Sequence, residues 1–267
     1  MSVEDADAGT KNETPLYGEP GSEPVTAWPK CIVNALCAPQ SDPAQLLAAA
    51  CTRVNLQTLP EYRLEEVLED DWVRRSQSQF EPVKISDKLW IVPSWADAPN
   101  RQAINLELDP GLAFGTGSHP STRLCLRWLE REIRGGERVL DYGCGSGILA
   151  IAALRLGAGA ALGVDIDAHA VAAARANAER NRVDARFFDT ETGPDMLADV
   201  IIANILANPL IVLAPLLARH LRPGGRIALS GILENQAEEV IRAYAPWARL
   251  YVSAREEGWV LLAGERA

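Results

Sequence analysis

Residues 139–147 read Val-Leu-Asp-Tyr-Gly-Cys-Gly-Ser-Gly, and they lie between a predicted buried strand and a predicted helix. Glycines 143, 145 and 147 let the backbone turn tightly and lie against a ligand where a Cβ would collide. The helix that follows points unbonded N–H groups at the same place. The stretch therefore predicts a ligand-binding turn; the alternative is a glycine-rich turn that binds nothing.

The spacing of this turn decides between two kinds of ligand. A dinucleotide fold uses Gly-x-Gly-x-x-Gly, with helix N–H groups facing a pyrophosphate. Here the third glycine comes one residue early, and Asp141 precedes Gly143 by two residues. S-adenosylmethionine has no phosphate but carries an ammonium and a sulfonium, which suit a nearby carboxylate. The turn therefore favours S-adenosylmethionine, with contacts at Gly143, Gly145, Gly147 and Asp141.

A second acid, Asp165, follows the next predicted strand. A carboxylate at that strand end accepts hydrogen bonds from both hydroxyls of a ribose. Dehydrogenases place an acid there too, so Asp165 indicates an adenosine ribose without deciding the cofactor. Asp167 is expected to cap the helix that begins at Ala168.

Asn204 is a polar residue at the carboxyl end of another buried strand, within Asp-Val-Ile-Ile-Ala-Asn-Ile-Leu-Ala at residues 199–207. Ligands bind at such strand ends in open α/β sheets. We expect Asn204 to face the reaction centre and hold an incoming amine through its side-chain oxygen; the alternative is a helix cap. N6-adenine methyltransferases place Asn-Pro-Pro-Tyr here and stack a flipped base on the aromatic ring. This chain has no aromatic residue there, which argues against a nucleic-acid substrate.

Strands and helices alternate through the second half of the chain. This pattern predicts an α/β fold, with a buried parallel sheet of Rossmann-like type and helices on both faces. Strands are expected at 138–140, 161–164, 185–188, 200–203, 226–229 and 259–263, and helices at 124–133, 147–156, 168–180, 209–220 and 236–244.

The first third of the chain has a different composition. It starts with an aperiodic segment rich in Glu, Asp, Gly, Pro and Thr, which predicts disorder. A strand at 31–36 and a helix at 43–51 then form an α/β unit too small for a robust core of its own. The expected segments are 1–29, disordered; 30–70, this small α/β unit; 71–108, a linker and interdomain segment; and 109–267, the Rossmann-like domain.

Composition limits the class of protein. The 267 residues are 48% hydrophobic and 23% charged, as in a folded soluble protein, and no apolar run approaches the ~20 residues of a membrane span. Five cysteines without a Cys-x-x-Cys pair and three distant histidines indicate a cytoplasmic protein with no metal site. The net charge of −10 disfavours direct nucleic-acid binding and suits a basic partner, although acidity also serves solubility.

Four segments together resemble the PrmA family of ribosomal protein methyltransferases. They are residues 109–122 (Asp-Pro-Gly-Leu-Ala-Phe-Gly-Thr-Gly-Ser-His-Pro-Ser-Thr), 141–152, 203–207 (Ala-Asn-Ile-Leu-Ala) and 230–233 (Ser-Gly-Ile-Leu). The resemblance runs from about Trp72 to the end of the sequence. It implies a class I S-adenosylmethionine methyltransferase acting on the α-amino group and lysine side chains of protein eleven of the large ribosomal subunit.

Position in the sequence assigns a role to one residue, and the resemblance assigns roles to others. His119 is the histidine nearest the motifs and is the candidate general base, although an organising role for its loop competes with that role. The cofactor contacts implied are Thr122, Gly143, Asp165 and Asn204, and the loop over the cofactor comprises Phe114, Gly115, Thr116, Gly117 and His119.

The N-terminal region departs from the family pattern. In the family a split β-α-β domain grips the ribosomal protein, whereas here only about 13 residues precede the stretch resembling Thr14–Tyr17. A first strand and helix are therefore expected to be absent, which leaves the substrate open. The resemblance thus implies that residues 30–70 are a remnant of the substrate-binding domain and that residues 109–267 are the methyltransferase domain. The alternatives are a nucleic-acid or small-molecule methyltransferase of this fold, and a nicotinamide-dependent oxidoreductase or non-catalytic nucleotide-binding module.

Overall fold

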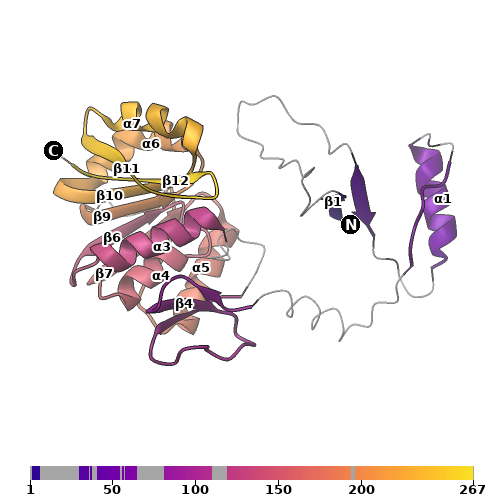
Figure 1. The fold of residues 1–267 in the computed structure, drawn as a ribbon, viewed down its shortest axis with the longest axis horizontal. Helices are drawn as coiled ribbons and strands as arrows, with labels where there is room; N and C mark the ends of the chain where they lie inside the picture. Colours follow the sequence, from indigo (N-terminus) through magenta and orange to yellow (C-terminus); the bar gives the residue numbers. More distant parts are fainter. Residues whose placement is uncertain are drawn as a thin grey trace. The chain divides into compact units, whose positions relative to one another are not determined.

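The computed structural model divides the chain into two compact units, Met1–Trp72 and Val73–Ala267 (Figure 1). The described residues are 2–6, 30–35, 37, 41–54, 56, 58–64, 81–109, 119–193 and 196–266. Most of the segment expected to be disordered, 1–29, lies outside them. None of the helices in the described residues combines the length and the apolar character needed to cross a bilayer.

The first unit contains two strands and a helix. Strand β1 (Ser2–Asp5) pairs antiparallel with β2 (Cys31–Asn34), and α1 spans Pro43–Arg53. The side chain of Asp42 accepts hydrogen bonds from the first-turn N–H groups of α1, which fixes where the helix begins. The predictions of β2 and α1 are confirmed. Strand β1 was not predicted, because its pairing partner lies far along the chain and local composition carries no sign of it.

Residues 81–109 form a small sheet rather than a simple connection. It contains β3 (Val83–Lys84), β4 (Leu89–Val92) and β5 (Ile104–Glu107), with β3–β4 antiparallel and β4–β5 parallel. Leu89, Ile91 and Leu106 are almost fully buried and belong to the core of the second unit. The structure thus differs from the expected linker at 71–108, because alternating apolar residues give these strands a face to bury.

The second unit is built on a seven-stranded sheet of order β11-β12-β10-β9-β6-β7-β8. The strands are β6 (Arg138–Tyr142), β7 (Ala160–Asp165), β8 (Arg186–Asp189), β9 (Ala198–Asn204), β10 (Leu221–Leu233), β11 (Ala248–Glu256) and β12 (Trp259–Arg266). Five neighbours, β8 to β10, run parallel, as predicted. Strand β12 is antiparallel to both β10 and β11, so the sheet is mixed.

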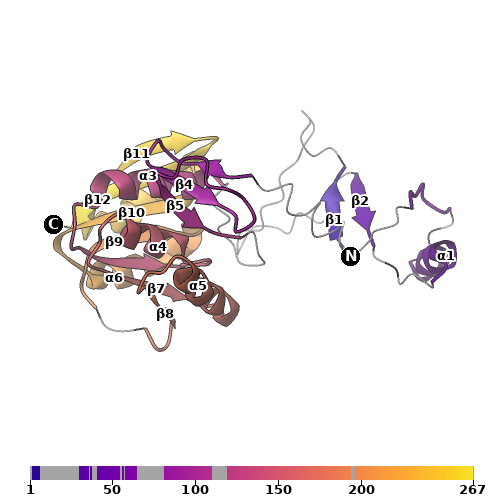
Figure 2. The ribbon, with the colours of Figure 1, turned by 90° about the horizontal axis from the view of Figure 1, so that it is seen from below.

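Helices cover both faces of this sheet, as predicted. The five helices are α3 (Pro120–Glu132), α4 (Ile148–Arg155), α5 (Ala168–Arg180), α6 (Ala207–His220) and α7 (Ala237–Tyr244). Figure 1 shows α6 and α7 on one face and α3, α4 and α5 on the other. Figure 2 shows the molecule from below, on the side of α3, α4 and α5, and β4 and β5 lie beside α3 there.

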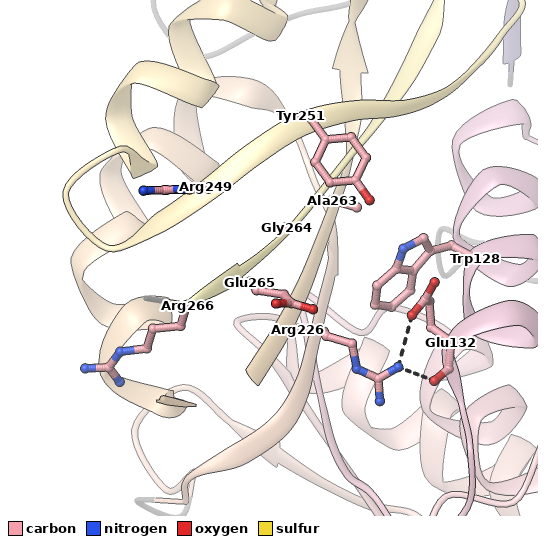
Figure 3. Close-up of a pocket in the computed structure, with 9 residues that line it drawn as sticks. All are labelled: Trp128, Glu132, Arg226, Arg249, Tyr251, Ala263, Gly264, Glu265 and Arg266. Atoms are coloured by element: carbon pink, nitrogen blue, oxygen red, sulfur yellow. Dashed lines mark hydrogen bonds and ion pairs between the residues drawn. The ribbon is translucent and has the colours of Figure 1, made fainter. Parts of the chain in front are cut away.

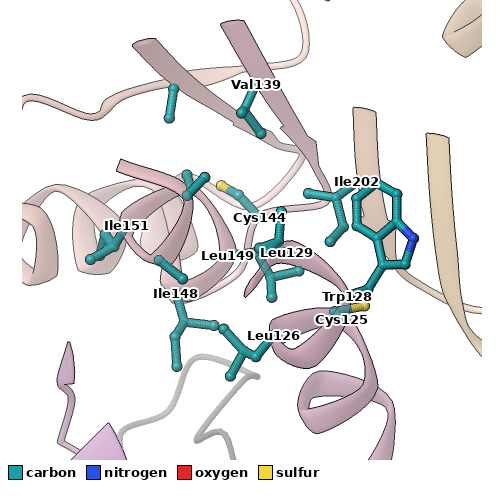
Figure 4. Close-up of a cluster of buried hydrophobic side chains, with 14 of the residues drawn as sticks. Cys125, Leu126, Trp128, Leu129, Val139, Cys144, Ile148, Leu149, Ile151 and Ile202 are labelled. Carbon is teal, nitrogen blue, oxygen red and sulfur yellow. The ribbon is translucent and has the colours of Figure 1, made fainter. Parts of the chain in front are cut away.

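Strand β9 shows how the sheet separates two hydrophobic cores. Val200 and Ile202 belong to the core shared with α3, α4 and α5, whereas Ile201 and Ala203 belong to the core under α6 and α7. The four side chains alternate between the two cores because successive residues of a strand point to opposite faces. All four are fully buried, since helices cover both faces of the sheet. Figure 4 shows the first core, in which Ile202 lies among side chains of α3 and α4. A strand buried on both faces holds its carboxyl end in a fixed position.

We expect Leu129→Ala to lower the free energy of unfolding of the second unit by about 2–5 kcal/mol, because it leaves a cavity between α3 and the sheet. Leu129 is 0% exposed. Leu197, which is 48% exposed, provides the control: Leu197→Ala should change stability by less than about 0.5 kcal/mol. Urea unfolding followed by tryptophan fluorescence measures both, and equal midpoints would contradict the assignment of α3 to the core.

Candidate active site

A cavity of about 640 Å³ lies at the carboxyl edge of the parallel strands. The ends of β6, β7 and β9 meet there, since Tyr142 of β6 pairs with Val164 of β7 and Asp141 of β6 pairs with Ile202 of β9. Ser230 of β10 pairs with Asn204 at the end of β9. The cavity brings together six of the predicted site residues. These are His119, Thr122, Gly143, Gly145, Asp165 and Asn204.

The glycine turn between β6 and α4 has the backbone conformation that its sequence predicted. Gly143, Gly145 and Gly147 all have positive φ, between +52° and +77°, a region that other residues enter only at a cost. The N–H groups of Gly143 and Cys144 both donate to the carbonyl of Val164, at 2.7 and 3.0 Å. The turn is thereby fastened to the end of β7, and two of its glycines line the cavity.

Gly147 has a packing role and does not line the cavity. A Cβ on Gly147 would come within 2.7 Å of the Phe187 ring and 2.9 Å of the Ala174 Cβ. Its absence lets the start of α4 lie close to α5 and β8. The predicted ligand contact at Gly147 therefore stays a prediction, whereas its role in packing is visible.

Asp141 lies behind the turn, where it is 0% exposed. Gly147 precedes α4 and has no side chain to cap the helix, and Asp141 Oδ2 accepts from the N–H of Ala150 at 3.1 Å instead. Asp141 Oδ1 has no partner among the described residues. Burial raises the pKa of Asp141 to about 7, against which the hydrogen bond from Ala150 acts. Asp141 thus supports the turn from within the core and is not among the cavity-lining residues.

Asp165 connects the turn to the cavity. Its Oδ2 accepts from the N–H of Gly145 at 2.8 Å, and its Oδ1 accepts from the N–H of Asp167 at 3.0 Å. The carboxylate is half-buried at the end of β7 and lines the cavity. One carboxylate therefore shapes the glycine turn and faces the ligand space. Asp167 caps α5 through the N–H of His169, as predicted.

Asn204 presents an unsatisfied acceptor at the cavity. Its Nδ2 donates to Thr122 Oγ1 at 3.1 Å, while its Oδ1 is buried and has no partner among the described residues. A buried amide oxygen without a donor costs about 1–3 kcal/mol, so a ligand N–H or O–H in this place is favoured. The alternative role as a helix cap is wrong, since α6 starts after Leu206 without a side-chain cap.

His119 caps α3 and forms part of the cavity wall. Its Nδ1 accepts from the N–H of Ser121 at 3.3 Å and lies 2.7 Å from Ser121 Oγ. Burial, with the nearby charge of Arg123, lowers the pKa of His119. A neutral ring that accepts at Nδ1 carries its proton at Nε2, so neither nitrogen offers a free lone pair. This geometry favours the organising role of His119 over that of a base.

Several cavity residues were not predicted from the sequence. Trp259 at the start of β12 meets His119 edge to face, with ring centroids 4.7 Å apart. The position of Trp259 depends on the antiparallel direction of β12, which the sequence did not predict. Thr190 follows β8 and was predictable by the rule that named Asp165. The apolar walls from α6 and the turn before it are Ile205, Leu206, Pro209 and Leu213.

The predicted loop residues Phe114, Gly115, Thr116 and Gly117 lie outside the described residues. The residues on either side of this loop, Asp109 and His119, are described. Asp109 accepts from Ser94 and pairs with Arg180, with an Nη1–Oδ2 distance of 3.0 Å. Within the described ranges, no group of three or more His, Cys, Asp or Glu could hold a metal ion.

A second cavity of about 460 Å³ opens near the amino ends of the parallel strands (Figure 3). Among its charged lining residues, Arg226 and Glu132 form an ion pair. Arg226 contacts the carboxylates of Glu132 and Glu137, each at 3.1 Å, and also the carbonyl of Glu132. These pairs join α3 to β10. The orphaned acceptor and the glycine turn lie instead in the larger cavity, which is therefore the candidate active site.

The larger cavity fits S-adenosylmethionine. Its volume lies in the range of about 300–1,000 Å³ that small-molecule sites occupy. It offers a bare glycine backbone, a carboxylate at the second strand end and an orphaned amide oxygen beyond it. The fold and the site together define a class I S-adenosylmethionine-dependent methyltransferase.

Comparisons with known proteins agree. The family model described as ribosomal protein L11 methyltransferase (PrmA) matches residues 1–267, and the chain belongs to this family. The family model therefore also matches the residues before Trp72, which the resemblance seen in the sequence motifs did not include. The L11 methyltransferases of Cupriavidus metallidurans and Ralstonia pickettii are 57% and 58% identical, over 100% and 99% of this chain and 88% and 89% of their own lengths. A solved ribosomal protein L11 methylase from Lactobacillus delbrueckii subsp. bulgaricus is 37% identical with a TM-score of 0.66, covering 70% of this chain and 99% of its own.

The raised pKa of Asp141 predicts a pH-dependent stability. Between about pH 4 and about pH 7 Asp141 keeps a proton in the folded protein that it releases in the unfolded chain, so the contribution of Asp141 to stability falls as pH rises through this window. Asp141→Asn removes the titration and keeps an acceptor for Ala150. Relative to wild type it should gain up to about 4 kcal/mol across the window.

Urea unfolding at about pH 4.5 and about pH 7.5 measures this difference. Asp184→Asn is the matched control, because Asp184 is exposed, and its stability should follow wild type. An Asp141→Asn curve that runs parallel to wild type across the window would show that Asp141 is ionised throughout.

Proposed function

We propose that this chain transfers methyl groups from S-adenosylmethionine to α-amino and lysine amino groups of ribosomal protein L11, the substrate in the names of its relatives. The observation that carries the proposal is Asn204 Oδ1, a buried acceptor without a partner in the described structure, beside the glycine turn. An amine N–H directed at this oxygen would have its lone pair oriented for attack on the methyl carbon.

The cofactor is held by backbone and carboxylate groups in this proposal. Asp165 accepts from the ribose hydroxyls, and the bare backbone of Gly143 and Gly145 allows the cofactor to approach closely. Asp141 acts through the turn that it supports. Bound S-adenosylmethionine supplies a methyl group already activated by its sulfonium, so the protein mainly positions and aligns the reactants.

The amine must be neutral before it reacts. A free lysine side chain has a pKa of about 10.4 and is protonated at neutral pH. The walls formed by Leu206, Pro209, Leu213 and Trp259 are mostly apolar, and desolvation there lowers the pKa of a lysine ammonium. The proton leaves to water, since His119 presents no free lone pair. Thr122 holds the Asn204 amide so that its oxygen keeps facing the amine.

The acidic chain suits a basic ribosomal protein, whose encounter it accelerates. We assign substrate docking to residues 30–70, which lie in the first unit. Its described part exposes large apolar side chains, and α1 buries only Cys51. Exposed apolar groups of this kind are typical of interaction surfaces. The exposed residues include Ile32, Val33, Leu46, Val54, Leu56, Leu59 and Leu64. Direct nucleic-acid binding forms no part of the proposal, and the setting is the cytoplasm.

No finding favours the alternatives. The residue after Asn204 is Ile205, which packs against the glycine turn and leaves no aromatic platform at the position used by N6-adenine methyltransferases. An oxidoreductase of the dinucleotide type needs a glycine spacing that this turn lacks.

Incubation with labelled S-adenosylmethionine and purified ribosomal proteins, followed by mass spectrometry, tests the substrate and the reaction together. We expect label on amino groups of L11 and a mass increase in multiples of one methyl group. Label confined to RNA, or NAD bound in place of S-adenosylmethionine in calorimetry, would overturn the proposal.

Asp165→Ala should weaken S-adenosylmethionine binding by about 2–3 kcal/mol, roughly 30- to 150-fold in Kd, because a charged acceptor is lost. Asp165→Asn should weaken S-adenosylmethionine binding less than Asp165→Ala, since an amide oxygen can still accept from the N–H of Gly145. Calorimetric titration measures both, with the exposed Asp184→Ala as control. An unchanged Kd for Asp165→Ala would remove this carboxylate from the cofactor site.

A further inference from the structure

The peptide backbone at Ile205, the residue after Asn204, lies against Gly231 of β10, and the Ile205 side chain lies against Gly143 in the turn after β6. A Cβ on Gly143 would lie 2.3 Å from Ile205 Cγ2. A Cβ on Gly231 would lie 2.4 Å from the carbonyl oxygen of Ile205, 2.8 Å from its carbon and 3.1 Å from its nitrogen. Real Cβ atoms essentially never lie within 3.0 Å of another heavy atom that is not bonded nearby. The carbonyl group of Ile205 therefore occupies space that only glycine at position 231 leaves open.

A bulge in β10 directs Gly231 toward this peptide. The pairing of β10 with β12 shifts between Leu229 and Ile232, and Gly231 has a φ of +80°. Its neighbour Ser230 pairs with Asn204 in the parallel ladder and donates through Oγ to the carbonyl of Val260 at 3.0 Å. Bulges of this kind redirect the backbone at one place while the ladder continues on both sides.

We propose that Gly231 is a positioning residue for Asn204, an inference that rests on the proposed function of Asn204 in holding the amine. Asn204 is fixed at two points: its side chain by Thr122 Oγ1, and the peptide backbone of the next residue, Ile205, by Gly231, while Gly143 packs against the Ile205 side chain. Displacing the peptide turns the amide oxygen away from the amine, although Gly231 itself has no group that reacts.

The chain provides a matched control for this proposal. Gly224 lies in the same strand with a φ of +70°, and a Cβ there would meet nothing within 4 Å. Gly231→Ala and Gly224→Ala therefore carry similar backbone strain. Only the first adds a collision with the Ile205 backbone. A difference between the two variants isolates the contact from the cost of placing alanine at positive φ.

The test compares kcat, KM for L11, Kd for S-adenosylmethionine and Tm in wild type and both variants. Gly231→Ala should lower kcat by roughly 10- to 100-fold. Its cofactor Kd should stay close to that of Gly224→Ala, which itself keeps the wild-type kcat. Its Tm should fall below that of Gly224→Ala, because only Gly231→Ala collides with the Ile205 backbone. Equal kcat values in the two variants would overturn the proposal. So would a loss confined to cofactor affinity, because Gly231 also lines the cavity.

A double-mutant cycle separates positioning from general damage. If Gly231 acts through Asn204, then Gly231→Ala should cause no further loss of kcat in an Asn204→Ala background, whereas independent effects would multiply. If Gly231→Ala does not fold, Ile205→Ala loosens the same peptide without a collision. Its loss of kcat should likewise disappear in the Asn204→Ala background, and a multiplicative loss would overturn the proposal. A wild-type chain that leaves L11 unmodified would instead refute the proposed function.

Discussion

Close approach of backbone to backbone at one edge of the sheet is the constraint on which the remaining structure depends. The turn after β6 hydrogen-bonds to the end of β7 and touches Ile205 after β9, and Gly231 of β10 lies against the same residue. A β-carbon at Gly143 or Gly231 would separate these segments. The shape of the cavity therefore depends on the missing β-carbons of Gly143 and Gly231 as well as on the side chains that line it.

The buried Asp141 shows how such an edge is held from the inside. A glycine at the start of α4 permits the turn but removes the usual helix cap, and Asp141 replaces that cap from the preceding strand. Burial raises the pKa of the Asp141 carboxyl group and also that of the Cys144 thiol. Both groups therefore favour their neutral forms in this apolar interior.

Features that are local in sequence were predictable. The helices, five parallel strands, Asp165 and Asn204 followed from periodicity and from the ends of apolar runs. Features that depend on distant partners were not. Strand β11 escaped because it is an edge strand whose exposed residues, such as Tyr251, break the apolar pattern. Without β11 the reversal of β12 and the place of Trp259 had no sequence signal, and the burial of Asp141 behind the turn depends on packing alone.

The position of β12 has a consequence for biosynthesis. This strand is the last of the described elements along the chain, yet it lies inside the sheet between β10 and β11. While the ribosome is still making the preceding helix and β11, the hydrogen-bonding edge of β10 has no neighbour on that side. Such an unpaired edge invites association with other chains. The edge of β10 therefore stays open to such association until β12 emerges and pairs with it.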